Sequence, residues 1–192
     1  MSEDYVVVEY NKIREEYPEF EKAITDCYEA ARAKAQSIWP GCRVSKSIYP
    51  KDGEFGETTV LAKFLRNRAG SRLGNTFRQN FASTGWNDIW YDNGNKMDED
   101  IIVAIPGIAF LSPTLNVTEI RYEIGDKIYS RINLEEMQGI EQPAIIFKEG
   151  LVISEEKGYR LRGYFEATGY QRIVPIKGLT VFKKKDDVIA DY

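Results

Sequence analysis

Apolar residues recur every three or four positions between Pro18 and Ile38, which is the spacing of one face of an α-helix. The apolar stripe comprises Phe20, Ala23, Ile24, Cys27, Ala31, Ala35 and Ile38. Pro18 suits a first helical turn, and Pro40-Gly41 suits a helix stop. We therefore predict a helix over 18–38 that packs on a core through this stripe, with docking on a neighbouring subunit as the alternative.

Beyond residue 41 apolar and polar positions alternate, and a period of two indicates β-strands. The predicted strands cover 42–49, 58–65, 86–91, 100–105, 117–124, 127–132 and 143–153, followed by three short strands within 158–184. The dipeptide Gly125-Asp126 is the signal of a tight hairpin. Turns are predicted at Asn93-Gly94, Thr168-Gly169 and Lys177-Gly178.

Short strands at near-regular spacing are typical of a β-sandwich or jelly roll. The predicted fold class is therefore α+β and mainly β: an N-terminal amphipathic helix packed on or beside an antiparallel, jelly-roll-like sandwich of about eight to ten short strands. A length of 192 residues suits a single domain, with a helical element over 1–41 and the sandwich over 42–192.

The stretch 158–184 carries arginines and aromatic residues that either present charge to a ligand or form the charged outer face of a packed sandwich. Tyr159 and Leu161 alternate with Arg160 and Arg162, which favours the second interpretation because one side of the strand is apolar. The arginines are predicted to face solvent or a subunit. Pro175 predicts an edge strand or a bulge, and an unprotected edge favours self-association.

Composition narrows the classes of function. The net charge of −4 gives no overall attraction to nucleic acid, so such binding requires a local basic patch. Histidine is absent, which removes the commonest general base and metal ligand. Two cysteines, Cys27 and Cys42, are too few for a zinc site or a disulfide framework, and Cys27 is expected to be a reduced core residue. We expect no catalytic residues, no cofactor and no metal; an enzyme that works without histidine is the less favoured alternative.

The N-terminus is acidic and has no basic segment of the kind that begins a secretory signal, so a cytoplasmic or virion location is expected. The longest apolar run, 101–111, is interrupted by Pro-Gly and is too short to cross a bilayer.

One basic segment stands out, because no acidic residue occurs between Glu57 and Asp88. Its candidate contact residues are Arg66, Arg68, Arg72, Arg78, Phe77, Phe81 and Trp86. Arginines interleaved with aromatic side chains suit nucleic-acid binding, here through residues 63–86. The alternatives are a subunit interface and a solvated loop whose positive charges are balanced by the acidic residues 98–100. The acidic turn 92–100 fails the spacing of an EF-hand and is interpreted as a plain turn.

The closely spaced strands of 117–185, the N-terminal helical arm and the lack of a catalytic motif resemble small β-sandwich, jelly-roll-like structural proteins of viruses of thermophilic hosts. The resemblance implies a self-associating homo-oligomer that serves as a coat or other virion component. A β-sandwich module that binds nucleic acid or carbohydrate is the alternative function.

Overall fold

The computed structural model describes residues 5–41, 44–48, 65–67, 69, 71–74, 76–125 and 127–183, with the backbone alone for 44–48, 127–130 and 182. The helices are α1 (Ile13–Glu16) and α2 (Phe20–Ile38), with 3-10 turns η1 (Tyr10–Lys12) and η2 (Glu135–Gly139). The strands are β1 (Tyr5–Glu9), β2 (Val44–Ile48), β3 (Arg78–Phe81), β4 (Gly85–Tyr91), β5 (Ile101–Phe110), β6 (Val117–Ile124), β7 (Lys127–Asn133), β8 (Pro143–Ile153), β9 (Tyr159–Phe165), β10 (Gly169–Ile176) and β11 (Leu179–Lys183).

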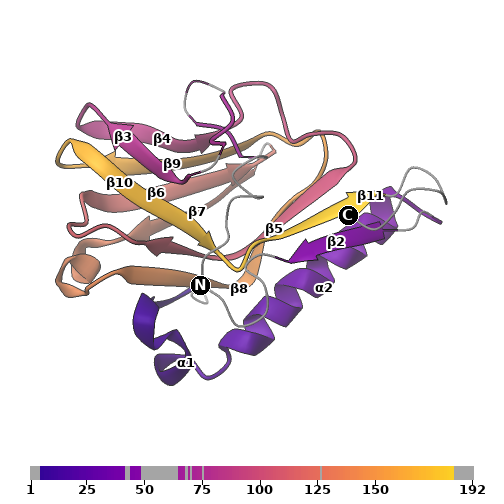
Figure 1. Cartoon of the computed structure of the whole chain (residues 1–192), viewed down its shortest axis with the longest axis horizontal. Coiled ribbons are helices and arrows are strands. Elements are labelled where there is room, and N and C mark those ends of the chain that lie inside the picture. The colour runs from indigo at the N-terminus through magenta and orange to yellow at the C-terminus, as the bar shows by residue number, and fades with distance from the viewer. Residues whose placement is uncertain are drawn as a thin grey trace.

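The strands form two antiparallel sheets (Figure 1). The larger sheet has the order β1-β8-β5-β10-β3, with β11 and β2 also attached beside β5, and the smaller has the order β4-β9-β6-β7. From β3 to β10 every connection except the β6–β7 hairpin crosses from one sheet to the other, which is the strand order of a jelly roll. The predicted α+β, mainly β fold is confirmed.

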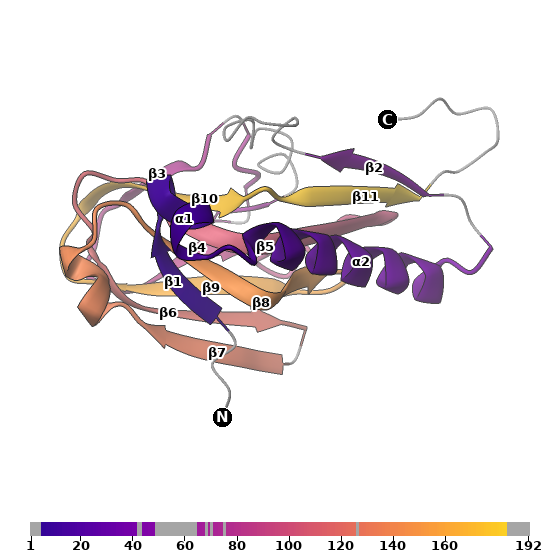
Figure 2. The ribbon, with the colours of Figure 1, turned by 90° about the horizontal axis from the view of Figure 1, so that it is seen from below.

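The two sheets and α2 form three layers, with the larger sheet in the middle. The side chains of β5 point alternately to the two sides of this sheet, and both sides are covered. Val103 and Ile105 face the smaller sheet and belong to the main apolar core between the sheets. Ile102 and Ala104 point to the other side, where the Ala-rich stripe of α2 covers them. Figure 2 shows α2 lying across this side of the larger sheet, next to β5 and β8. Both faces of β5 are therefore buried, which explains its nearly continuous apolar sequence.

The face that α2 buries is the one predicted from the sequence. Six residues of the predicted stripe are buried, namely Phe20, Ala23, Ile24, Cys27, Ala31 and Ala35, while Ile38 is half-buried. The stripe packs on the sheet of its own chain, as expected for a core helix. Cys27 is a free, buried thiol. After the helix, the indole Nε1 of Trp39 donates a 2.8 Å hydrogen bond to Glu155, which ties the helix end to the chain after β8.

β5 continues through Pro106-Gly107, although the sequence predicts that the strand ends at residue 105. On one side of β5 its partner changes at this point, because β11 pairs with the first four residues and β10 with the last four. On the other side the register with β8 shifts between Ile105 and Gly107. Pro106 has no N–H, and it lies where β5 changes its partner strand on one side and its register on the other.

The turn predicted at Lys177-Gly178 is wrong. Ile176 pairs with Gly107 and Leu179 with Ala104, which is one uninterrupted register, so β11 continues β10 along β5. The hairpin at residues 125–126 is confirmed, since β6 and β7 pair directly across it. The predicted strand 58–65 lies outside the described residues except for Leu65. The short strands β1 and β3 are present without having been predicted.

Candidate functional site

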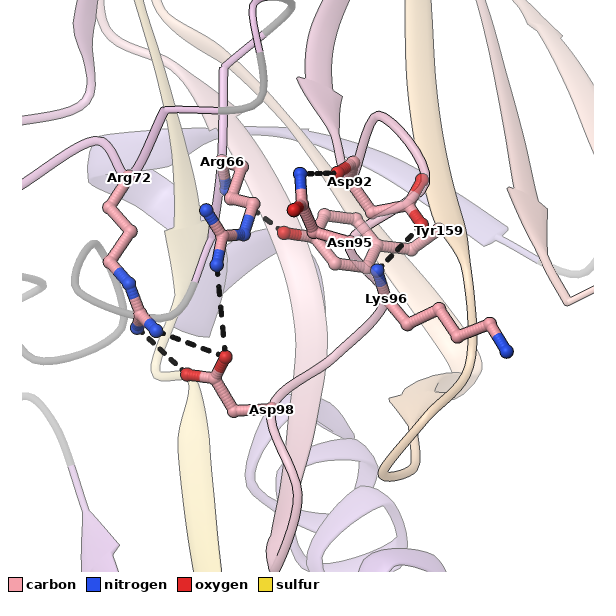
Figure 3. Close-up of polar contacts among 7 residues, drawn as sticks. All are labelled: Arg66, Arg72, Asp92, Asn95, Lys96, Asp98 and Tyr159. Atoms are coloured by element: carbon pink, nitrogen blue, oxygen red, sulfur yellow. Dashed lines mark hydrogen bonds and ion pairs between the residues drawn. The ribbon is translucent and has the colours of Figure 1, made fainter.

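Two arginines of the basic segment lie against an acidic partner (Figure 3). Arg72 binds Asp98 with two hydrogen bonds of 2.8 and 3.0 Å, and Arg66 lies 3.9 Å from the same carboxylate. The backbone N–H of Arg66 donates to the hydroxyl of Tyr159 over 3.0 Å, and burial raises the pKa of that tyrosine. Asp98 thus supplies the counter-charge that the solvated-loop alternative requires. Arg68 lies outside the described residues.

Two aromatic residues of the basic segment belong to the core. Phe77 is 2% exposed and packs edge-on to Trp90, with the ring centroids 6.0 Å apart. Phe81 is also 2% exposed and stacks on Phe165 at 4.1 Å. Neither ring is accessible for stacking on a ligand, because both fill the space between the sheets.

Arg78 lies elsewhere, on the short outermost strand β3 of the larger sheet. Its guanidinium lies 3.8 Å above the ring of Tyr170 on the paired strand β10. Tyr170 is 55% exposed, so this contact is an isolated surface cation–π pair.

Trp86, the remaining candidate, lies on the outer face of the smaller sheet, which is the face turned away from the core. Cross-strand pairing assigns the residues of this outer face: Trp86, Asp88 and Tyr91 from β4, Arg160, Arg162 and Tyr164 from β9, Glu119, Arg121 and Glu123 from β6, and Arg131 and Asn133 from β7. The sequence-based prediction that Arg160 and Arg162 are on the outer side of their strand agrees with this placement. The structure therefore distributes the six described candidates over four separate places.

Arginines and aromatic rings are interleaved on the outer face. The guanidinium of Arg121 lies 4.3 Å from the ring centre of Trp86, and that of Arg162 lies 5.7 Å from it. Tyr164 meets Trp86 edge-on at 5.5 Å. Arg160 lies 4.4 Å from the ring centre of Tyr91.

Asp88 is the main acidic partner on this face. Arg160 holds it with hydrogen bonds of 2.6 and 3.0 Å, and this bidentate pair raises the pKa of the arginine. The Nε of Arg162 is 3.5 Å from the same carboxylate, and the Nε of Arg121 is 3.5 Å from Glu119. Neither of these Nε atoms has a hydrogen-bond partner, although both are buried.

The sequence-based list of candidates omitted the arginines of β6, β7 and β9. The sequence does indicate that Arg121, Arg160 and Arg162 lie on an outer face, because apolar and polar residues alternate along their strands and these arginines occupy polar positions. Bringing them to one face requires the pairing of β9 with both β4 and β6, and these strands are far apart in the chain.

No group of three or more acidic or cysteine side chains among the described residues could hold a metal ion. In the turn after β4, Asp92 instead accepts the backbone N–H of Lys96, and the amide of Asn95 donates to the carbonyl of Asp92 (Figure 3). Among the helices of the described part, none is long and apolar enough to cross a membrane.

A second feature is the edge formed by β1, whose single neighbour among the described strands is β8. The backbone N–H of Tyr10 donates to Gln142, and bonded positions alternate in an antiparallel ladder, so Val6 and Val8 bond to β8. Tyr5, Val7 and Glu9 consequently point their N–H and C=O groups away from the sheet. The N–H of Glu9 agrees with this, since it donates to the Glu16 carboxylate over 3.1 Å.

An open groove of about 760 Å³ adjoins this edge. It is lined by Tyr5, Val6, Val7, Asn133, Glu135, Glu136, Met137, Ile140 and Lys148. The groove therefore lies where the open edge of β1 in the larger sheet meets the end of β7 and η2. Tyr5 and Val7 are half-buried and pack on the main core, so the edge is apolar on its inner side.

Comparison of the chain with known proteins finds no matching protein-family model and no curated protein of significant sequence similarity.

Proposed function

We propose that this chain is a non-enzymatic structural protein that self-associates through the open edge of β1, with a second copy of the chain as its partner. The single observation that carries the proposal is the outward direction of the N–H and C=O groups of Tyr5 and Val7. An unpaired strand edge with apolar side chains is a template for pairing with another chain.

The edge is self-complementary. A two-fold axis beside Val6 pairs Tyr5 of one copy with Val7 of the other, and Val7 with Tyr5. Both positions face outward, so each pair exchanges two hydrogen bonds of an antiparallel ladder. The larger sheets of the two copies then form one continuous sheet, which is an isologous interface. Glu16 limits the pairing to this short stretch because it already binds the N–H of Glu9.

A coat or other virion component is the setting that we propose for this assembly. The jelly-roll strand order supports it, because this architecture recurs in viral capsid proteins. Lectin domains share the same architecture, and a fold by itself does not determine a function. The proposal therefore rests on the strand edge, with the fold as its context.

The test is the replacement of Val7 by proline. Proline removes the outward N–H but leaves the bonds of Val6 and Val8 to β8 intact, so the fold should persist while association is lost. Light scattering over a concentration series should show the parent as an oligomer and Val7→Pro as a monomer. A thermal melt checks that the variant is folded.

Val7→Ala is the matched control, because it shortens the same side chain and keeps the N–H. It should associate like the parent. A parent chain that stays monomeric up to about millimolar concentration would overturn the proposal, since interfaces weaker than that contribute only about 4 kcal/mol. Equal association of Val7→Pro and Val7→Ala would show that the interface lies elsewhere.

A further inference from the structure

Three arginines lie side by side across the outer face of the smaller sheet. Arg121 on β6 is paired directly with Arg162 on β9 and with Arg131 on β7. Neighbouring strands are about 4.8 Å apart, so this arginine row spans roughly 10 Å. Like charges at directly opposed positions of a sheet repel each other. Something must therefore offset the repulsion between these three arginines.

Contacts within the chain stabilise the row only in part. Trp86 offers its ring to Arg121 and Arg162, and a cation above an aromatic ring is attracted to it. Asp88 lies in line with the row, but Arg160 binds both of its oxygens at 2.6 and 3.0 Å. Arg162 therefore meets Asp88 only at 3.5 Å, and Arg121 meets Glu119 at the same distance.

The row keeps unused capacity to bind an anion. The side chains of Arg121 and Arg162 remain 27% and 30% exposed, although the Nε of each is buried and lies 3.5 Å from a carboxylate. Arg131 is exposed and its guanidinium has no ion-pair partner within the described part of the chain. Among the described side chains of the outer face, four arginines stand against three carboxylates.

From this geometry we propose that the arginine row, Arg162, Arg121 and Arg131, binds the phosphate groups of a single-stranded nucleic acid. The planar guanidinium group donates pairs of N–H bonds to phosphate oxygens, and the ring of Trp86 helps to hold the donors of Arg121 and Arg162 in place. The charge of the row is complementary to a phosphate backbone that runs across the strands.

Aromatic side chains beside the row favour a single strand over a duplex. Tyr164 is 40% exposed and lies on β9 two residues after Arg162, on the same face. An unpaired base can stack on its ring there. A duplex keeps its bases inside and would offer only phosphates to this flat face. The chain as a whole carries a charge of −4, so the binding must come from the local row.

The experiment is the binding of a fluorescent oligothymidylate of about twelve nucleotides to the full chain, measured by anisotropy between about 50 and 200 mM salt. The parent should bind, and the affinity should fall steeply with salt. Arg131→Gln removes an exposed charge and should reduce the slope of log K against log salt by about 0.7. The double variant Arg121→Gln/Arg131→Gln should reduce it by about 1.4.

Arg32→Gln is the control, because Arg32 is an exposed arginine on α2, at the opposite side of the larger sheet. It should bind like the parent. A parent that does not bind, or an Arg131→Gln variant with the parent's affinity and slope, would contradict the proposal. Tighter binding of a heparin fragment or of a duplex of equal length would assign the row to sulfated sugars or to paired DNA, and would also overturn it.

This proposal does not depend on the open edge of β1. Val7→Pro should keep the oligonucleotide affinity per chain, whereas Arg131→Gln should keep the oligomeric mass. Each proposal can therefore fail without the other.

Discussion

Gly150 meets Cys27 where β8 passes under α2. Its backbone has a φ of +73°, and a Cβ at this position would lie 2.3 Å from the Sγ of Cys27. Gly150→Ala therefore adds backbone strain and overpacking, and we expect it to lower the free energy of unfolding by about 2 to 5 kcal/mol. Urea unfolding followed by circular dichroism measures the loss.

Gly139→Ala is the control for this prediction. It also exchanges a glycine for alanine, but no heavy atom lies within 4 Å of the added Cβ. Its midpoint should stay near that of the parent. Equal midpoints for Gly150→Ala and Gly139→Ala would mean that β8 and α2 do not approach each other as described.

The thiol of Cys27 also makes stability depend on pH. Burial raises its pKa from 9.0 to about 12. Above about pH 9 the unfolded chain loses this proton while the folded chain retains it, so rising pH favours unfolding. The contribution should approach about 1.4 kcal/mol per pH unit between pH 9 and 12.

Urea unfolding at about pH 8, 9 and 10 gives the free energy of unfolding as a function of pH. The contribution of the thiol is the difference between the slopes of the parent and of Cys27→Ala. The parent should lose stability faster with rising pH, because the variant lacks the ionising group. Parallel slopes would show that the thiol is not desolvated in the folded protein.

At the scale of elements, the apolar stripe of α2 is the strongest link between sequence and fold. Ile24 lies in this stripe and is 5% exposed, in a cluster with residues of β5 and β8. Ile24→Asp would bring a charge without a partner into this cluster, and we expect it to cost on the order of 4 kcal/mol. The thermal midpoint is the measurement.

The exposed neighbour Thr25 provides the comparison, since Thr25→Asp adds the same charge on the solvent side of the same helical turn. That variant should melt within a few degrees of the parent. Similar melting of Ile24→Asp and the parent would exclude the packing of this helix on the sheet.

The basic segment shows why loops are harder to predict than helices. Its arginines form no repeat, and β3 within it is only four residues long and mostly polar. Pairing with β10 makes it a strand, and that partner lies about ninety residues further along the chain. The counter-charge for Arg66 and Arg72 likewise comes from Asp98, after β4 and its turn.

At the scale of the whole molecule, the layers determine which surfaces can serve a partner. α2 covers one side of the larger sheet, and the smaller sheet covers the other. The outer face of the smaller sheet has no such cover among the described elements, so its arginine row is accessible. The edge of β1 belongs to the larger sheet, whereas the row crosses β9, β6 and β7 of the smaller sheet.

The sequence alone determined the features that depend on neighbours within a few residues. The helix stripe follows from a period of 3.6 residues, and the strand β6 follows from a period of two. The hairpin at residues 125–126 follows from its glycine. Local backbone geometry sets each of these three features, so each can be predicted from the sequence without knowledge of the fold.

Only the tertiary structure decided which strands lie side by side. Continued from its two-residue loop, the β6–β7 hairpin would place Arg121 opposite Ser130. A register shift between Tyr122 and Glu123 places it opposite Arg131 instead. Pairing of β6 with β9 then adds Arg162 to the row. Such alignments depend on packing between distant strands, because a shift of one residue moves every side chain to the other face.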